Sequence, residues 1–374
     1  MNTLVYRPMT AAVTRSKGAP FTLESARIRE PHGDEVLVRI VATGMCHTDM
    51  IVRDQYYPVP LPAVLGHEGS GVVEAIGPLV QGLKVGDHVV LTYGYCGQCL
   101  SCGAGHMSYC RDFFARNFSG GGPTGDSALQ DGAGDRLNDH FFAQSSFASL
   151  ALARENNAIK VSRDAPLELL GPLGCGIQTG AGAVINSLKI NPGSSFAAFG
   201  AGAVGLSAVL AARVAGATTI IAVDVVQSRL NLAIELGATH VINSNDTDPV
   251  TAIREITSGG VNFALESTGR PAVLRLAVDA LGSRGNLGVV GAPPLGTVAE
   301  FDVNDLLLGG KTIRGIVEGD SAPKKFIPEL VDLYLQGRFP FDKLVKFYRF
   351  DEINQAAEDS EKGITIKPII RIAP

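Results

Sequence analysis

The stretch Ser195-Phe-Ala-Ala-Phe-Gly-Ala-Gly-Ala-Val-Gly205 decides the fold of the second half of the chain. A short apolar run, typical of a buried β-strand, leads directly into Gly200, Gly202 and Gly205, and a helical pattern of apolar residues follows. Such glycines allow a tight turn and a close approach of the backbone to a pyrophosphate, which the start of the helix around Val204 would bind. The stretch therefore predicts a dinucleotide-binding βαβ unit.

The acidic residue Asp224 supports this interpretation. It ends the next predicted strand, 19 residues after Gly205, where a carboxylate accepts hydrogen bonds from the ribose hydroxyls of adenosine. Its charge would repel the 2′-phosphate of NADP, and no arginine follows immediately, so the sequence favours NAD. Arg229 lies one turn into the following helix, either as an adenosine contact or as an ordinary solvated charge. Val290 belongs to a strand whose carboxyl end is expected at the binding crevice.

The chain divides into two predicted domains, as its 374 residues would lead one to expect. Strands and helices alternate from residue 178 onwards, which predicts a doubly wound parallel sheet of the Rossmann type, an α/β fold. In residues 1–177, strand-like runs such as 35–41 and 71–76 are broken by glycine and proline turns, which predicts a mainly β domain. The β-like tail over residues 364–372 is free to return to the first domain.

Four of the six cysteines lie on one short loop, in a predicted lobe of about residues 94–112: Cys96, Cys99, Cys102 and Cys110. This spacing lets four thiolates surround one tetrahedral zinc ion, and a site with every position filled by sulfur is structural. Two loop disulfides are the alternative. Cysteines three residues apart are awkward to bridge, and nothing in the chain indicates secretion, so zinc is favoured.

The other two cysteines, Cys46 and Cys175, have no partner nearby in the sequence. A lone cysteine is commonly a small apolar core residue. Here Cys46 opens the run Cys-His-Thr-Asp, Cys175 lies between two glycines, and His67 stands between them in Gly-His-Glu-Gly. Two thiolates and an imidazole predict a second zinc site, with a fourth position open to water or substrate.

Neither nucleic acid nor a membrane is an expected partner. The formal net charge is −5, and the sequence has no basic cluster. The N-terminus lacks the continuous apolar core of a signal peptide, which predicts a cytoplasmic location. The apolar stretch 196–223 contains Arg213 and several glycines, so it fits a buried βαβ unit better than a lipid span.

Taken together, the motifs of this chain resemble those of the zinc-dependent medium-chain alcohol dehydrogenases, in the same order and over essentially the whole chain. The resemblance implies a GroES-like catalytic domain of residues 1–177 and 321–374, interrupted by a Rossmann NAD-binding domain of residues 178–320. It implies two zinc ions per subunit, with Cys46, His67 and Cys175 as ligands of the catalytic one. The implied reaction is oxidation of an alcohol to its aldehyde, with hydride transfer to NAD.

The resemblance also assigns roles to five further residues. Thr48 would contact the reacting alcohol, Asp49 would orient His67, and Glu68 would lie behind the metal as a transient ligand. His47 and Lys367 would bind the pyrophosphate of the cofactor. The alternative for Asp49 and Glu68 is that they are surface carboxylates near turns, and for His47 that it is a solvated side chain.

One departure from the family pattern is Ile51, where many relatives have a histidine that ends a proton relay. An alkyl group neither accepts nor donates a proton, so the proton would leave through Thr48, the cofactor ribose and water, or through His47. This segment looks most like that of the aryl-alcohol (benzyl alcohol) dehydrogenases. Aromatic side chains suited to a planar substrate, or simply to core packing, occur in stretches that include Thr92, Tyr93, Phe118, Phe141 and Phe142.

The predicted substrate is therefore a primary alcohol with an aromatic or allylic group beside the carbinol. A broad aliphatic or glutathione-adduct alcohol dehydrogenase of the same superfamily is the first alternative. A zinc- and NAD-binding protein without catalysis is an alternative of another class. The resemblance suggests a homodimer or homotetramer, with a Rossmann edge strand near residues 306–317 pairing between subunits.

Overall fold

The computed structural model describes residues 5–123 and 125–372, which form two compact units. The first unit combines the chain up to Cys175 with Ala322–Leu335 and the chain from Asp342 onwards. The second consists of Gly176–Ser321 and Gln336–Phe341. The last of these segments differs from the predicted division, in which the whole chain after residue 320 belongs to the catalytic domain.

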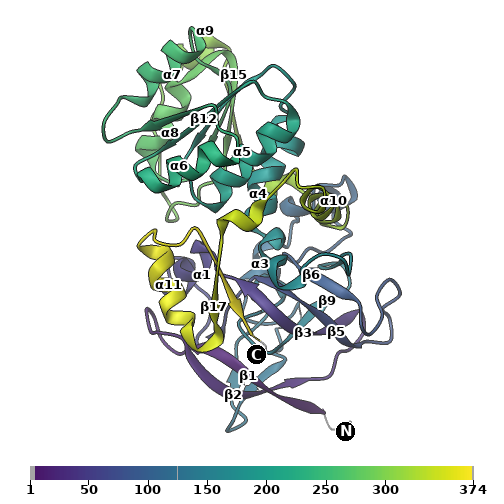
Figure 1. Cartoon of the computed structure of the whole chain (residues 1–374). Coiled ribbons are helices and arrows are strands. Elements are labelled where there is room, and N and C mark those ends of the chain that lie inside the picture. The colour runs from purple at the N-terminus through teal and green to yellow at the C-terminus, as the bar shows by residue number, and fades with distance from the viewer. Residues whose placement is uncertain (1–4, 124, 373–374) are drawn as a thin grey trace. The chain divides into compact units, whose positions relative to one another are not determined.

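The first unit is built on two sheets of mostly antiparallel strands (Figure 1). The smaller sheet has the order β4-β1-β2-β7-β8, with bounds Ala63–Val64, Tyr6–Thr14, Thr22–Arg29, Leu129–Asp131 and Arg136–Leu137. The larger has the order β10-β6-β5-β3-β18-β17, with bounds Ala158–Lys160, His88–Leu91, Glu68–Ile76, Glu35–Gly44, Lys367–Arg371 and Val345–Arg349. Strand β9 (Leu150–Arg154) also pairs with β3.

Strand β3 is the centre of the larger sheet because it pairs with three other strands, β5, β9 and β18. Its apolar run is almost fully enclosed: Val36, Leu37 and Val38 are each 0% exposed. A strand covered on both faces needs such a continuous apolar sequence. The C-terminal strand β18 lies antiparallel to β3, with Ile369 opposite Gly44, so the tail of the chain is part of the first unit (Figure 1, yellow beside purple).

The second unit confirms the predicted parallel sheet. Its strand order is β13-β12-β11-β14-β15-β16 and every pairing is parallel, with bounds His240–Asn243, Thr219–Asp224, Ser195–Phe199, Val261–Glu266, Leu281–Val289 and Thr312–Gly315. This order, with the chain running outwards from β11 in both directions, is that of a doubly wound sheet. Helices connect the strands: α5 (Ala203–Ala215), α6 (Gln227–Leu236), α7 (Pro249–Thr257), α8 (Pro271–Asp279) and α9 (Val303–Gly309).

The remaining helices are mostly short. They are α1 (His47–Arg53), α2 (Leu100–Gly103), α3 (Phe113–Asn117), α4 (Gly176–Gly182), α10 (Pro323–Leu335) and α11 (Ile353–Glu361), with a π-helical turn, η5, at Ala183–Leu188. Single 3₁₀ turns are η1 (Met107–Tyr109), η2 (Phe141–Ala143), η3 (Leu167–Leu169), η4 (Gly171–Gly174), η6 (Glu318–Asp320), η7 (Phe341–Leu344) and η8 (Phe350–Glu352). Within the described parts of the chain, every helix is too short or too polar to cross a bilayer.

Candidate active site

The glycine turn has the geometry that its sequence predicts. Gly200 follows β11 with a φ of +97°, which favours glycine. A Cβ on Gly205 would come within 1.7 Å of the Gly200 carbonyl oxygen, so only glycine fits there. Gly202 is the N-cap of α5, and a Cβ on it would meet open space. The start of α5 is therefore accessible to a phosphate group.

Asp224, at the end of β12, is bound to the same turn. Its Oδ2 accepts a hydrogen bond of 2.7 Å from the backbone N–H of Ala201, and its Oδ1 accepts bonds from Val225 and Val226. The Nη1 atom of Arg229 lies 3.9 Å from Oδ2. Contacts of Asp224 and Arg229 with adenosine stay predictions.

Val290 directly follows β15, and its backbone N–H donates to the carbonyl of Glu266 at the end of β14. This bond joins the carboxyl ends of two neighbouring parallel strands, the edge of such a sheet where ligands bind. A contact between Val290 and the cofactor stays a prediction.

The three predicted ligands of the catalytic zinc lie close together in the first unit, next to Glu68. One ligand atom each from Cys46, His67, Glu68 and Cys175 lies within 4.8 Å of the others. Cys46 directly precedes α1, His67 directly precedes β5, and Cys175 directly precedes α4. Three loop ends that are far apart in the sequence thus meet at one point.

Asp49 joins two of these loop ends. Its Oδ2 accepts a hydrogen bond of 2.8 Å from the backbone N–H of Cys46, and its Oδ1 accepts one of 3.1 Å from that of Gly66. The Nδ1 atom of His67 lies 2.9 Å from the same Oδ1. Asp49 is fully buried, as is Glu68, so the alternative that these two are surface carboxylates is wrong. Asp49 thus has the position of a carboxylate that orients a metal-binding histidine, and this role stays a prediction.

The donor set fits a zinc ion. The Nε2 atom of His67 is buried and has no hydrogen-bond partner among the described residues, although a buried nitrogen without one is costly. The pKa of the Cys46 thiol lies well below its ordinary value, because the neighbouring Cys175 stabilises the thiolate and this effect outweighs burial. Two sulfur ligands and one imidazole nitrogen are the ligands of an open catalytic zinc site.

Lys367 lies against this group. Its Nζ is 2.9 Å from each carboxylate oxygen of Glu68 and donates to the carbonyl of Met45. Burial lowers the pKa of Lys367, but the charges of Glu68, Cys46 and Cys175 together raise it above its ordinary value. The structure thus places the ammonium on Glu68, whereas the resemblance assigns it to the pyrophosphate; a pyrophosphate contact stays a prediction.

The other predicted residues of this region lie on α1. The Oγ1 atom of Thr48 is 3.7 Å from the sulfur of Cys46, so its hydroxyl is beside the metal group. His47 is exposed in the first turn of the helix, and Ile51 is half-buried one turn later. The structure therefore brings Thr48 to the site and leaves the side chain of His47 free to meet a ligand.

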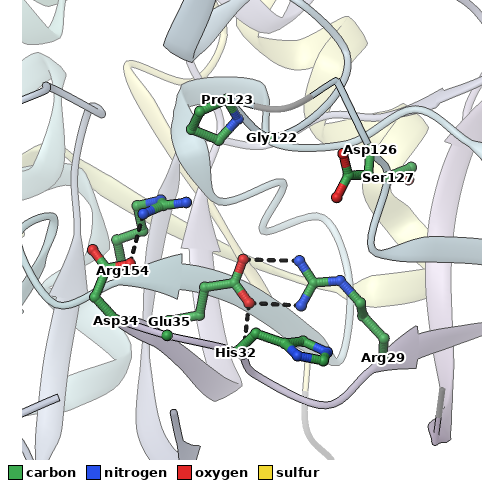
Figure 2. A pocket seen from close by; sticks show the side chains of 10 residues that line it. Arg29, His32, Asp34, Glu35, Gly122, Pro123, Asp126, Ser127 and Arg154 are labelled. Atoms are coloured by element: carbon green, nitrogen blue, oxygen red, sulfur yellow. Dashed lines mark hydrogen bonds and ion pairs between the residues drawn. The ribbon is translucent and has the colours of Figure 1, made fainter. Parts of the chain in front are cut away.

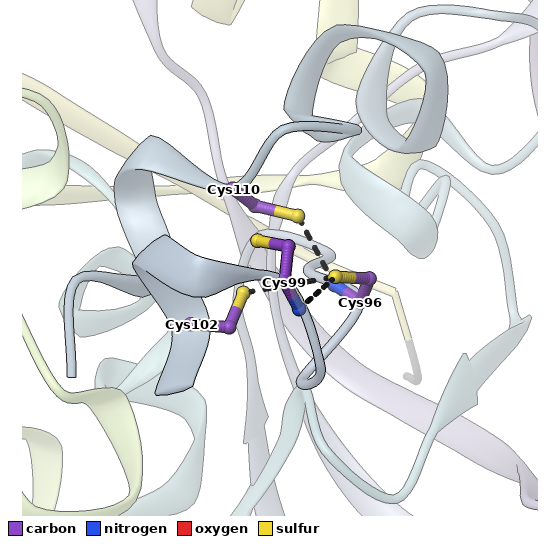
Figure 3. A group of neighbouring side chains, drawn as sticks. All are labelled: Cys96, Cys99, Cys102 and Cys110. Carbon is purple, nitrogen blue, oxygen red and sulfur yellow. Dashed lines mark hydrogen bonds between the residues drawn. The ribbon is translucent and has the colours of Figure 1, made fainter. Parts of the chain in front are cut away.

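The four remaining cysteines form the predicted quartet (Figure 3). Their sulfur atoms lie within 4.8 Å of one another, and all six cysteines of the chain are free, which excludes the loop disulfides. Backbone N–H groups donate to the sulfurs, from Cys96 to Cys110 and from Cys99 to Cys96. Hydrogen bonds to its sulfur, first from the backbone N–H of Arg111 and then from that of Cys102, lower the pKa of Cys99 to about 6. Such a closed set of thiolates fits a structural zinc ion.

Aromatic side chains surround His67. The ring of Phe142 stacks on the imidazole with centroids 4.5 Å apart, and Phe141 meets it edge-on at 5.2 Å. Phe118 contacts both phenylalanines, and Tyr93 lies in the same core cluster. The hydroxyl of Thr92 donates to the carbonyl of Gly174, the residue before Cys175.

Sequence reasoning missed Gln144, which connects two parts of the site. Its Nε2 donates to the carbonyl of His67 at 2.9 Å, and its Oε1 accepts a bond of 3.0 Å from the backbone N–H of Gly69. Gln144 is 2% exposed. No local signal marks it, because a glutamine in a loop is ordinarily a solvated residue.

A separate cavity of about 360 Å³ lies in the first unit and is lined by charged residues (Figure 2). None of its lining residues is a predicted site residue. Arg29 forms a bidentate pair with Glu35, and Arg154 pairs with Asp34. These four charges are thus paired with one another within the wall, as charges removed from water are.

Comparisons with known proteins define the class. The chain matches the family described as alcohol dehydrogenase GroES-like domain over residues 32–163 and the family described as zinc-binding dehydrogenase over residues 203–336. The protein belongs to the zinc-dependent medium-chain alcohol dehydrogenases, with a GroES-like domain and a Rossmann domain, as the sequence predicts. Zinc and a nicotinamide dinucleotide are the cofactors of this class.

Several individual proteins are similar to this chain over nearly its whole length. The structure of benzyl alcohol dehydrogenase from Acinetobacter calcoaceticus is 70% identical, with a TM-score of 0.96 over 98% of this chain and 100% of that chain. The structure of an alcohol dehydrogenase zinc-binding domain protein from Burkholderia ambifaria is 74% identical, with a TM-score of 0.98 over 99% and 100%. Geraniol dehydrogenase from Castellaniella defragrans is 49% identical and covers 96% of both chains.

The role of Asp49 leads to a prediction about zinc binding. In Asp49→Asn one side-chain oxygen becomes an amide N–H₂ group, which cannot accept the hydrogen bond from Cys46 or Gly66. We expect the zinc affinity of the Cys46 group to fall about 10- to 100-fold, measured by competition with a chelator, while the quartet keeps its metal. Asp54→Asn, at the end of the same helix, is the control. An unchanged zinc affinity in Asp49→Asn would contradict the role of Asp49.

Proposed function

We propose that the protein oxidises a primary alcohol of the benzyl type to its aldehyde, with NAD as the hydride acceptor. The observation that carries this proposal is the group of Cys46, His67 and Cys175, with a polar hydroxyl on one side and aromatic rings around the imidazole. The 70% identity to a benzyl alcohol dehydrogenase supports the aromatic substrate. The buried carboxylate of Asp224 supports NAD over NADP.

The chemistry divides between cofactors and protein. When bound, zinc supplies a Lewis acid for the alcohol oxygen and the nicotinamide ring supplies a hydride acceptor. Asp49 holds His67 in one orientation. The hydroxyl of Thr48 both accepts and donates a proton, so it takes the proton of the alcohol and passes it to water or to the exposed His47. Phe118, Phe141 and Phe142 keep the surroundings apolar.

A second candidate substrate is an allylic alcohol. Geraniol dehydrogenase, named for an allylic primary alcohol, is 49% identical over nearly the whole chain. An allylic and a benzylic carbinol both carry a planar π-system beside the reacting carbon, and aromatic side chains suit either. The two candidates therefore need a direct comparison of rates.

The test is the initial rate of NADH formation at 340 nm by the zinc-loaded protein. We expect benzyl alcohol to react fastest, geraniol to follow, and ethanol and hexanol to be slow, with NAD strongly preferred to NADP. Faster turnover of hexanol or of the formaldehyde–glutathione adduct would favour the aliphatic or glutathione-adduct alternative. No turnover of any alcohol, with zinc and NAD bound, would favour a non-catalytic protein.

Ile51 leads to a prediction about proton release. In Ile51→His an imidazole on α1 can accept a proton near neutral pH. We expect the rate of hydride transfer, measured in single turnovers against pH, to gain an ionisation between about pH 6 and 7. Ile51→Leu keeps an alkyl group and is the control. Identical pH profiles for the two variants would show that Ile51 leaves no gap in the proton path.

We further propose that two copies associate at the β16 edge of the parallel sheet, beside the exposed apolar side chains of α9. Among the described residues, strand β16 is the last in the order of the parallel sheet, and Val303, Leu307 and Leu308 on the preceding helix are 73%, 71% and 84% exposed. An edge strand beside exposed apolar side chains is a natural interface between identical subunits.

The mass of the protein in solution tests this association. We expect the protein to sediment as a dimer or tetramer and Leu308→Asp to shift it towards the monomer, because a charge would be buried in the interface. Leu100→Asp, at a residue that is 94% exposed in the zinc lobe, should leave the mass unchanged. A Leu308→Asp protein with the mass of the original would contradict the proposal.

A further inference from the structure

The segment that carries Phe141 and Phe142 has an unusual backbone. Four of its non-glycine residues have positive φ angles: His140 at 57°, Phe142 at 50°, Ala143 at 54° and Ser145 at 55°. Residues with a Cβ seldom adopt this conformation, and a bulky aromatic residue is an outlier there. Such a backbone persists only where the surrounding structure determines it, and it is concentrated at functional sites.

Hydrogen bonds to the loop that carries His67 determine this backbone. The hydroxyl of Ser145 donates to the carbonyl of Val64 at 2.7 Å, and the backbone N–H of Ser146 donates to the carbonyl of Gly66 at 2.9 Å. The side chain of Gln144 donates to the carbonyl of His67 and accepts from the backbone N–H of Gly69. Hydrogen bonds therefore hold residues 144–146 of the strained segment against residues 64–69, which include the predicted metal ligand His67.

In this arrangement the ring of Phe142 stacks on the imidazole of His67. The two rings are 4.5 Å apart at an angle of 26°, and both are buried, with Phe142 5% and His67 0% exposed. The contact of Asp49 with Nδ1 holds one edge of the imidazole, but a single hydrogen bond leaves the ring free to rotate about its direction. A flat ring against the imidazole face removes that rotation.

We propose that Phe142 is a positioning residue for the catalytic metal: its ring fixes the plane of the His67 imidazole and so directs Nε2 towards Cys46 and Cys175. The strained backbone holds the Phe142 ring in the required orientation. This inference rests on the zinc site and is independent of which alcohol is oxidised. It also explains why an aromatic residue that could line a substrate pocket has one face occupied by a metal ligand.

The test distinguishes the effect of the planar ring from the effect of the space that the side chain fills. Phe142→Leu retains an apolar side chain without a planar face, and Phe142→Tyr restores the face. Phe118→Leu is the matched control, because Phe118 is also buried and contacts both Phe141 and Phe142. Zinc release to a chelator reports on both metal groups, and the quartet serves as an internal check that each variant is folded.

We expect the Cys46 group of Phe142→Leu to bind zinc about 10-fold more weakly. When cobalt replaces zinc in the Cys46 group of Phe142→Leu, its visible spectrum should differ from that of cobalt in the original protein. Phe142→Tyr should match the original protein in both readouts, and Phe118→Leu should keep its spectrum.

Zinc affinity and cobalt spectrum unchanged in Phe142→Leu would overturn the proposal, as would an equal loss in Phe118→Leu. Should Phe142→Leu fail to fold, Phe142→Met, which adapts to the same space, replaces it with the same criteria. A failure of the alcohol assay would not affect these readouts.

Discussion

One buried carboxylate, that of Asp49, connects two of the three segments on which the metal group is built. It accepts backbone hydrogen bonds from Cys46 and Gly66 and faces the imidazole of His67. A carboxylate at 0% exposure is tolerated only when such donors surround it. The start of α1 and the loop before β5 therefore hold each other in place, and the position of the ligands follows from that mutual constraint.

In the second unit, Asp224 holds loop backbone in place in a similar way. There the carboxylate accepts from Ala201 in the glycine turn and from Val225 and Val226 beyond β12. In both units a short acidic side chain at the end of an element fixes a loop that must present backbone or side-chain groups to a cofactor. Pre-organisation of this kind avoids the entropic cost of ordering the loop when the ligand binds.

Features marked by a local pattern or by the family resemblance were predictable from the sequence, whereas individual contacts between distant residues outside that pattern were not. The glycine turn, the parallel sheet and the cysteine quartet each follow from a local pattern with one physical meaning. The pairing of Lys367 with Glu68 joins residues 299 positions apart, and the alignment of Gln144 with His67 joins residues 77 apart. Only the folded chain reveals such contacts, because composition and periodicity carry no information about them.

The position of β18 has a consequence for the order in which the protein is made. Its pairing with β3 completes the larger sheet of the first unit, and it brings Lys367 to Glu68. A ribosome that has reached residue 321 has synthesised all seven predicted metal-ligating residues and most of the second unit, but not this strand. Since domains generally fold as units in the order of synthesis, the inserted unit can be complete while Glu68 still lacks its counter-charge. The Cys46 group gains this counter-charge only after β18 has been synthesised and has paired with β3.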